Sequence, residues 1–99
     1  MSGIANNVVT VASAGTAVRF TTAPTPIKSV IIHATDGNTG NVFVGDSTVD
    51  STNTPPLTPG TDLKITFREH VEETLGDLAD FYVDAATSAD TVTYLAVTT

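Results

Sequence analysis

The segment 38–67 constrains the fold of this chain more than any other part of it. Residues 62–68 alternate apolar and polar side chains, residues 41–45 place Val42 and Val44 on one face and Phe43 on the other, and a long polar stretch separates the two. Side chains that alternate in this way face opposite sides of a sheet. Pro59 and Gly60 stand just before the second alternating stretch, where a fixed φ angle followed by a left-handed one makes a type II turn. The segment therefore predicts two strands joined through a rigid corner.

Similar short stretches recur along the chain between turn signals. The strand candidates are residues 8–12, 17–21, 27–35, 41–45, 62–68, 78–85 and 91–97. Residues 27–35 carry apolar groups on both faces, which predicts a central strand that is covered on both sides. The chain also holds 19 Thr and 12 Val, and β-branched residues favour strands. We expect an all-β fold, either a single antiparallel β-sandwich or a jelly-roll-like small barrel of about seven strands.

The chain length fits one domain, residues 1–99, and residues 1–7 are a candidate flexible N-terminal arm. Residues 13–16 predict either a hairpin turn or a corner between two sheets. Residues 69–75 are good helix formers over only two turns, and they predict a short helical bridge between strands.

The charge balance excludes several classes of partner. Four basic residues stand against 11 acidic ones, so the net charge is −7. A surface of this sign repels phosphate backbones and anionic lipids, and we expect neither nucleic-acid nor membrane binding. No apolar run approaches the roughly 18 residues of a membrane span. Without cysteine, the chain has no disulfide and no thiolate metal site.

Two histidines are the first candidates for chemistry. His70 lies beside Glu69, Glu72 and Glu73, and imidazole with carboxylates can hold a metal. The cluster lacks a second nearby histidine, and an exposed acidic turn is the commoner explanation. His33 lies in the most apolar strand candidate, where an ordinary sheet histidine is packed or hydrogen-bonded at its polar tip.

Two groups of polar residues resemble fragments of known sites. Asp36, Asn38 and Asn41 have the spacing of a calcium loop, but the required twelfth-position Glu is a serine, which favours a β-turn. Asp80 and Asp84 are too far apart along a strand to share a proton, and we expect them to be solvated on its outer face. Neither a nucleophile elbow nor a phosphate-binding loop occurs. We therefore expect no catalytic, cofactor-binding or metal-binding residue, and no enzyme activity.

Three motifs follow one another in order. They are NTGNVFVG at 38–45, PLTPG at 56–60 and LADFYVDA at 78–85. This order resembles small β-structured virion proteins of tailed bacteriophages and related prokaryotic viruses. Residues 16–19 and Ile31 fit the pattern as well, so the resemblance covers most of the chain.

The resemblance implies a non-enzymatic virion protein, most similar to a capsid decoration (cement) protein that binds the outer head surface and stabilises the shell. Its partner would be the major capsid protein, and a homo-oligomer, with a trimer as first choice, would match a local symmetry axis. The protein would be made in the host cytoplasm and reside on the capsid surface. The alternative is a tail- or head-fibre-associated module that binds a receptor or adaptor protein, with Tyr82 and Tyr94 as candidates if a glycan is bound. A metal-dependent hydrolase that uses His70 is a third class.

The polar loop 46–58 is the candidate contact with a partner, because function concentrates in loops on rigid scaffolds. It could instead be an outward-facing tip or a tether that becomes ordered on assembly. The candidate contact residues are Asp46, Val49, Asp50, Asn53, Pro55, Pro56 and Leu57.

Overall fold

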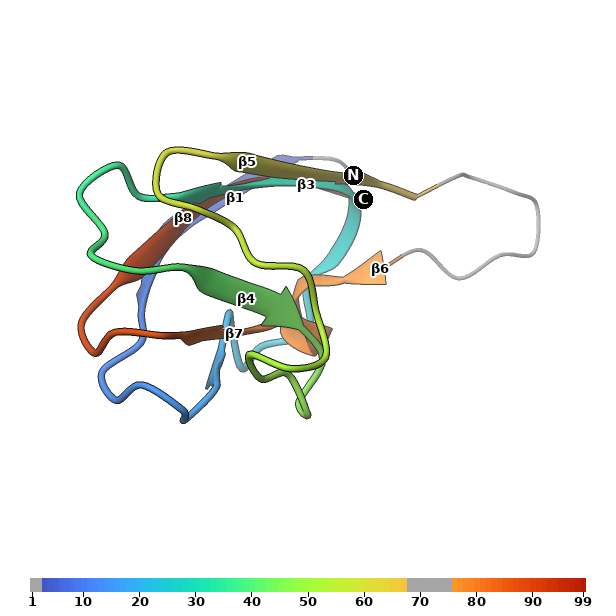
Figure 1. Cartoon of the computed structure of the whole chain (residues 1–99). Helices are drawn as coiled ribbons and strands as arrows, with labels where there is room; N and C mark the ends of the chain where they lie inside the picture. Colours follow the sequence, from blue (N-terminus) through green and yellow to red (C-terminus); the bar gives the residue numbers. More distant parts are fainter. Residues whose placement is uncertain (1–2, 68–75) are drawn as a thin grey trace.

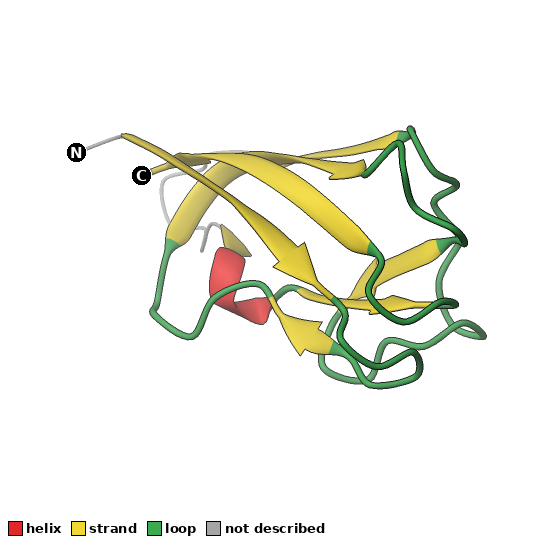
Figure 2. Ribbon diagram, turned by 90° about the vertical axis from the view of Figure 1, so that its left-hand side faces the viewer, coloured by secondary structure: helices red, strands yellow, loops and turns green. Residues whose placement is uncertain are grey.

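The computed structural model describes residues 3–67 and 76–99, whose strands form two antiparallel sheets (Figure 1). The larger sheet has the order β1 (Gly3–Thr10), β8 (Thr91–Thr98), β3 (Pro26–Ala34), β5 (Asp62–Thr66), and β6 (Gly76–Asp77) pairs with the start of β3. The smaller sheet has the order β2 (Val18–Arg19), β7 (Tyr82–Ala85), β4 (Val42–Gly45). One 3₁₀ turn, η1 (Leu78–Asp80), lies between β6 and β7 and is the helical segment in Figure 2. The all-β prediction is confirmed.

An apolar core lies between the two sheets. Ile32 of β3 and Val92 of β8 are fully buried from the larger sheet, and Val42 of β4 and Val83 of β7 are fully buried from the smaller one. Because buried side chains come from both sheets, the sheets face each other across one shared core.

Aromatic side chains link the two layers. The ring of Phe20, just after β2, stacks on Tyr94 of β8 with 5.4 Å between centroids, and its centroid lies 5.9 Å from that of Phe81. Offset contacts of this kind add to the free energy that burial alone provides. Burial also raises the pKa of the Tyr94 hydroxyl.

The Pro59-Gly60 corner has the predicted type II geometry. Thr61 N–H donates to the Thr58 carbonyl at 3.1 Å, and Gly60 has a φ of 86°. Gly60 N–H also donates to the carbonyl of Ala34 at 2.7 Å, which ties the corner to the end of β3. The corner thereby sets the position of β5 beside β3.

The turn at residues 13–16 is a corner between sheets. Thr16 N–H donates to the Ser13 carbonyl at 3.0 Å, and Gly15 has a φ of 88°. The turn connects β1 of the larger sheet with β2 of the smaller one, which decides between the two predicted alternatives.

Three local predictions need correction. Residues 3–7 are not a free arm, because β1 begins at Gly3 and pairs with β8 from Gly3 opposite Thr98 onward. Residues 78–80 are not a strand, because Asp77 accepts a hydrogen bond from Ala79 N–H at 2.9 Å and caps the 3₁₀ turn. β3 is central, between β8 and β5, but the prediction that both its faces are covered is wrong: Ile31 is 37% exposed. The predicted helical bridge at 69–75 lies outside the described residues.

Candidate functional site

The outer face of the larger sheet carries the exposed large apolar side chains of the described residues. These are Ile4, Val8, Ile31, Leu95 and Val97. Ile4 lies opposite Val97 between β1 and β8, and Leu95 lies opposite Ile31 between β8 and β3. Directly opposed side chains in an antiparallel pair are neighbours, so these four residues form one continuous patch across three strands. Val8 lies opposite Thr93 on the same side of the sheet. We call it the apolar face.

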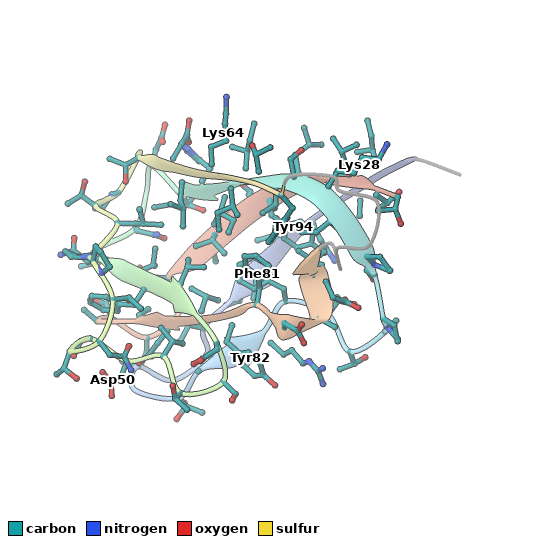
Figure 3. All side chains as sticks on the ribbon, turned by 90° about the vertical axis from the view of Figure 1, so that its right-hand side faces the viewer. Lys28, Asp50, Lys64, Phe81, Tyr82 and Tyr94 are labelled. Atoms are coloured by element: carbon teal, nitrogen blue, oxygen red, sulfur yellow. The ribbon has the colours of Figure 1, made fainter. Side chains whose placement is uncertain are left out.

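The two lysines of the chain border the apolar face. Lys64 of β5 lies opposite Ile31, and Lys28 lies at the irregularity of β3 between Ile27 and Ser29. Figure 3 shows both lysines pointing away from the molecule on this side, whereas Asp50 lies on the opposite side. In a chain with a net charge of −7, both lysines therefore lie beside the apolar face, and the carboxylate of Asp62, opposite His33, lies on the same side of the sheet.

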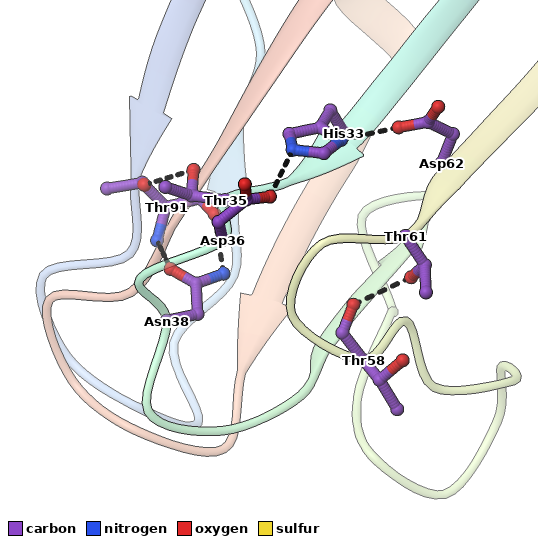
Figure 4. A network of polar contacts seen from close by, with 8 residues as sticks. All are labelled: His33, Thr35, Asp36, Asn38, Thr58, Thr61, Asp62 and Thr91. Carbon is purple, nitrogen blue, oxygen red and sulfur yellow. Dashed lines mark hydrogen bonds and ion pairs between the residues drawn. The ribbon is translucent and has the colours of Figure 1, made fainter.

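His33 lies at one end of this face, between two carboxylates (Figure 4). Its Nδ1 contacts Asp62 of β5, and its Nε2 lies 2.9 Å from Oδ1 of Asp36. The hydrogen bond to Asp62, followed by that to Asp36, raises the pKa of His33 above its ordinary value. Both ring nitrogens can donate only when the imidazole is protonated. The prediction of a hydrogen-bonded sheet histidine is confirmed.

The turn at 36–38 is a β-turn, as predicted, and its polar groups bind the protein itself. Asn38 N–H donates to the Thr35 carbonyl at 3.0 Å, and the Asn38 side chain bonds to both backbone groups of Thr91 at 2.8 and 2.9 Å. Buried Asp90 accepts the N–H groups of Thr39 and Gly40 at 3.0 and 2.9 Å. These bonds fasten the turn before β4 to the start of β8.

The loop 46–58 is hydrogen-bonded within itself. Asp46 accepts from the N–H and hydroxyl of Thr48, and Asp50 accepts from the same groups of Thr52, at 2.5 to 2.9 Å. The hydroxyl bonds, followed by the backbone bonds, lower the pKa of both carboxyls. Asn53 accepts from Asp50 N–H at 3.1 Å and donates to the Thr48 carbonyl at 2.8 Å.

The predicted contact residues of this loop fall into two groups. Asp46, Asp50, Asn53, Pro55 and Pro56 are exposed. In contrast, Val49 is only 5% exposed, and Leu57 packs against the core and exchanges backbone hydrogen bonds with Val42 at 3.0 and 2.9 Å. The absence of a side chain at Gly45 allows Val49 to pack against the backbone there, because a Cβ at this position would lie 3.0 Å from the Val49 side chain.

The remaining candidates have structural surroundings or lie outside the described residues. Asp84 is buried, not solvated as predicted, because it accepts from the N–H groups of Gly15 and Ala85 at 2.9 and 2.7 Å. Asp80 is exposed. Tyr94 belongs to the core, and Tyr82 is half-buried with the Arg19 guanidinium 5.8 Å from its ring centroid.

The predicted metal cluster of His70 with Glu69, Glu72 and Glu73 lies outside the described residues. Within residues 3–67 and 76–99, no three His, Asp or Glu side chains are grouped as metal ligands. The same part of the chain has no helix with the length and apolar character needed to cross a bilayer.

Sequence reasoning missed a cavity of about 310 Å³ between the two sheets. It opens beside β4 and β5, and its apolar lining comes from Val44, Leu63, Ile65, Phe67 and Phe81. Asp46, Asp77 and Asp80 also line it, together with Gly45 and Gly76. Alternation identified the inward side chains of β5, but the cavity depends on which strands pair, and that pairing is non-local.

Comparison with protein-family models, curated proteins and solved structures finds no match to this chain.

Proposed function

We propose that this protein is a non-enzymatic virion structural protein that decorates a capsid and binds it through the apolar face. Of the two predicted folds, the two facing antiparallel sheets support the antiparallel β-sandwich. The sequence motifs at 38–45, 56–60 and 78–85 supply the resemblance to virion proteins.

The gathering of the exposed large apolar side chains on one sheet face is the observation that carries the proposal. Single exposed apolar residues are ordinary, but a continuous patch marks an interaction surface. Ile4 is 67% exposed and Val8 is 54% exposed, and neither contributes to the core of its own domain. A partner that covers the face removes this area from water, which favours binding.

The distribution of charge gives the bound protein an orientation. Lys28 and Lys64 would meet the shell, and the acidic loop 46–58, which follows β4 of the other sheet, would point outward. Of the alternatives for the loop, this arrangement favours the outward tip. Acidic groups at the outer surface favour solubility and reduce non-specific association of the particles.

Stabilisation follows from mass action. A protein that binds the assembled shell but not its separated subunits shifts the equilibrium towards the shell. A homo-oligomer adds avidity, because several copies of the same face bind together. β1 is a candidate contact between copies, since it is an edge strand of eight residues with neither a charged residue nor a proline.

The proposal is tested with emptied capsids of the virus that carries the protein. Wild type should co-sediment with these capsids and raise the temperature at which they break apart. The Leu95→Asp variant should lose at least tenfold in affinity for the capsid, because it places an unpaired charge in a patch that binding would bury. The Thr22→Asp variant adds the same charge at an exposed corner and serves as the matched control.

A third variant, Pro56→Asp, separates the face from the loop. Loss of binding with Pro56→Asp and retention with Leu95→Asp would show that the loop 46–58 makes the contact. Absence of binding by wild type would overturn the decoration role. Imaging of intact particles distinguishes the alternative function, since protein found only at the tail or at one vertex contradicts uniform decoration of the head.

A further inference from the structure

The cavity between β4 and β5 suggests a second binding site, on a different side of the molecule from the apolar face. β5 ends the larger sheet, and in the described part of the chain it pairs only with β3. Its inward side chains Leu63 and Ile65 are half-buried and line the cavity. Apolar side chains therefore occur beside a strand edge that no other described strand pairs with, and we call it the free edge of β5.

The wall of the cavity opposite β5 is formed by the edge of β4, which the described residues pair only in part. On the side of β4 away from β7, the Val42–Leu57 bridge is the pairing found among the described residues. Val44 and Gly45 lie beyond this bridge and line the cavity. Among the described residues, Leu57 thus closes one end of this side of the molecule, and the other end is open.

The size of the cavity suits side chains. An engineered apolar cavity of roughly 150 Å³ accepts a benzene molecule. A cavity of about 310 Å³ can therefore take one large or two smaller apolar side chains. Backbone groups on the free edge of β5 can pair with an added strand, which is a recurrent mode of peptide recognition.

The negative charge at the opening of the cavity favours a partner segment that carries a basic residue. Asp46 and Asp80 line the cavity and are also exposed, so they border its opening to solvent. No lysine or arginine is among the described residues that line it. Asp77 also lines the cavity, but it is half-buried and its Oδ1 accepts from the N–H groups of Thr25 and Ala79.

We propose that an extended segment of a partner protein pairs with the free edge of β5 and inserts an apolar side chain between the sheets, with a lysine or arginine two residues away facing Asp46 and Asp80. Residues two apart on a strand share a face and lie roughly 6.5 Å from each other. The apolar and basic groups of the segment therefore both point toward this chain. The site is independent of the apolar face and of any capsid.

Two nonapeptides with blocked ends provide the probe. Both alternate threonine with apolar or charged residues and carry a central leucine; one has lysine two positions to either side of it, and the other has glutamate there. Each is titrated into the full-length, isotope-labelled chain and followed by NMR. The lysine peptide should shift the amide resonances of Val44, Leu63 and Ile65 and bind at least tenfold more tightly than the glutamate peptide.

Variants locate the binding. Asp80→Asn should reduce the preference for the lysine peptide severalfold. Asp50→Asn, which changes another exposed carboxylate in the loop 46–58, should leave the preference unchanged. Leu95→Asp should also leave peptide binding unchanged, so failure of this proposal is distinct from failure of the capsid proposal. Equal affinity for the two peptides, no shifts at millimolar peptide, or shifts confined to the apolar face would overturn it.

Discussion

Leu95 lies directly opposite Ile31 across the β8–β3 ladder, and both side chains remain exposed, at 46% and 37%. Two strands of the larger sheet thereby place apolar groups side by side on the surface that faces away from the core. Leu95 lies on β8, the middle of the three strands that form the apolar face, where a partner would cover it most fully. The side chains of β8 that point to the other side of the sheet, such as fully buried Val92, pack in the core.

Replacing Leu95 by threonine should change the free energy of unfolding by less than about 1 kcal/mol, because threonine suits a strand and the site is half-exposed. The same change at Val92 buries a hydroxyl and should cost roughly 1–3 kcal/mol. Urea denaturation measures both. Binding of a hydrophobic dye should fall in Leu95→Thr only, and an equal loss of stability in the two variants would contradict the assignment of faces.

Asp90 should be one of the most important polar residues for stability, since its buried carboxylate accepts two backbone hydrogen bonds. Asp90→Ala leaves both N–H groups without this acceptor and should cost about 2–4 kcal/mol. Asp90→Asn retains one acceptor oxygen and should cost about half as much. Asp50→Ala, in an exposed turn, should cost less than about 1 kcal/mol and is the control in chemical denaturation.

Alternation along the sequence was sufficient to predict β5 and its buried face. In β5, Leu63 and Ile65 face inward and Lys64 faces outward, as their spacing requires. The corner at Gly60 was also predictable, because a proline followed by a glycine has few conformations available. Both features depend on residues that are close together in the sequence.

The apolar face and the cavity could not be predicted, because they depend on pairing between distant strands. Ile31 becomes a neighbour of Leu95 only when β3 pairs with β8 in one register. An apolar residue on the second face of β3 has the same pattern whether the chain covers it or leaves it exposed. The burial of Val49 could not be predicted for a similar reason, since it depends on how the loop 46–58 folds back against Gly45.

Gly60 and Gly37 provide a matched test of the Pro59-Gly60 corner, because of the two only Gly60 has a positive φ. Gly60→Ala should destabilise the protein by about 1–2 kcal/mol, because its φ of 86° is unfavourable for a residue with a Cβ. In addition, the new Cβ would lie 3.3 Å from Asp36 Oδ1. Gly37→Ala meets no atom within 4 Å and should be neutral or slightly stabilising. Thermal unfolding separates them, since each kcal/mol shifts the Tm of a domain of this size by about 4–8 °C.

His33 should make the stability of the fold depend on pH near neutrality. Its pKa is raised in the folded state by hydrogen bonds to Asp62 and Asp36, so the folded protein holds the proton more tightly than the unfolded chain does. The stabilisation is complete below the unfolded pKa of about 6.5 and is lost as the pH rises through the higher folded pKa. Above that value the neutral ring can donate to only one of the two carboxylates.

As the pH rises from about 6.5 through the higher folded pKa of His33, the free energy of unfolding should therefore fall by more in the wild type than in His33→Gln. The comparison removes the contribution of His70, which both proteins contain. NMR titration of the imidazole, assigned with the same variant, should give a pKa above the ordinary histidine value. Asp62→Asn should lower that pKa more than Asp36→Asn does, because the bond to Asp62 is the larger cause. An unshifted histidine pKa, or an identical pH dependence in wild type and His33→Gln, would show that the bridge between β5 and the 36–38 turn is absent in solution.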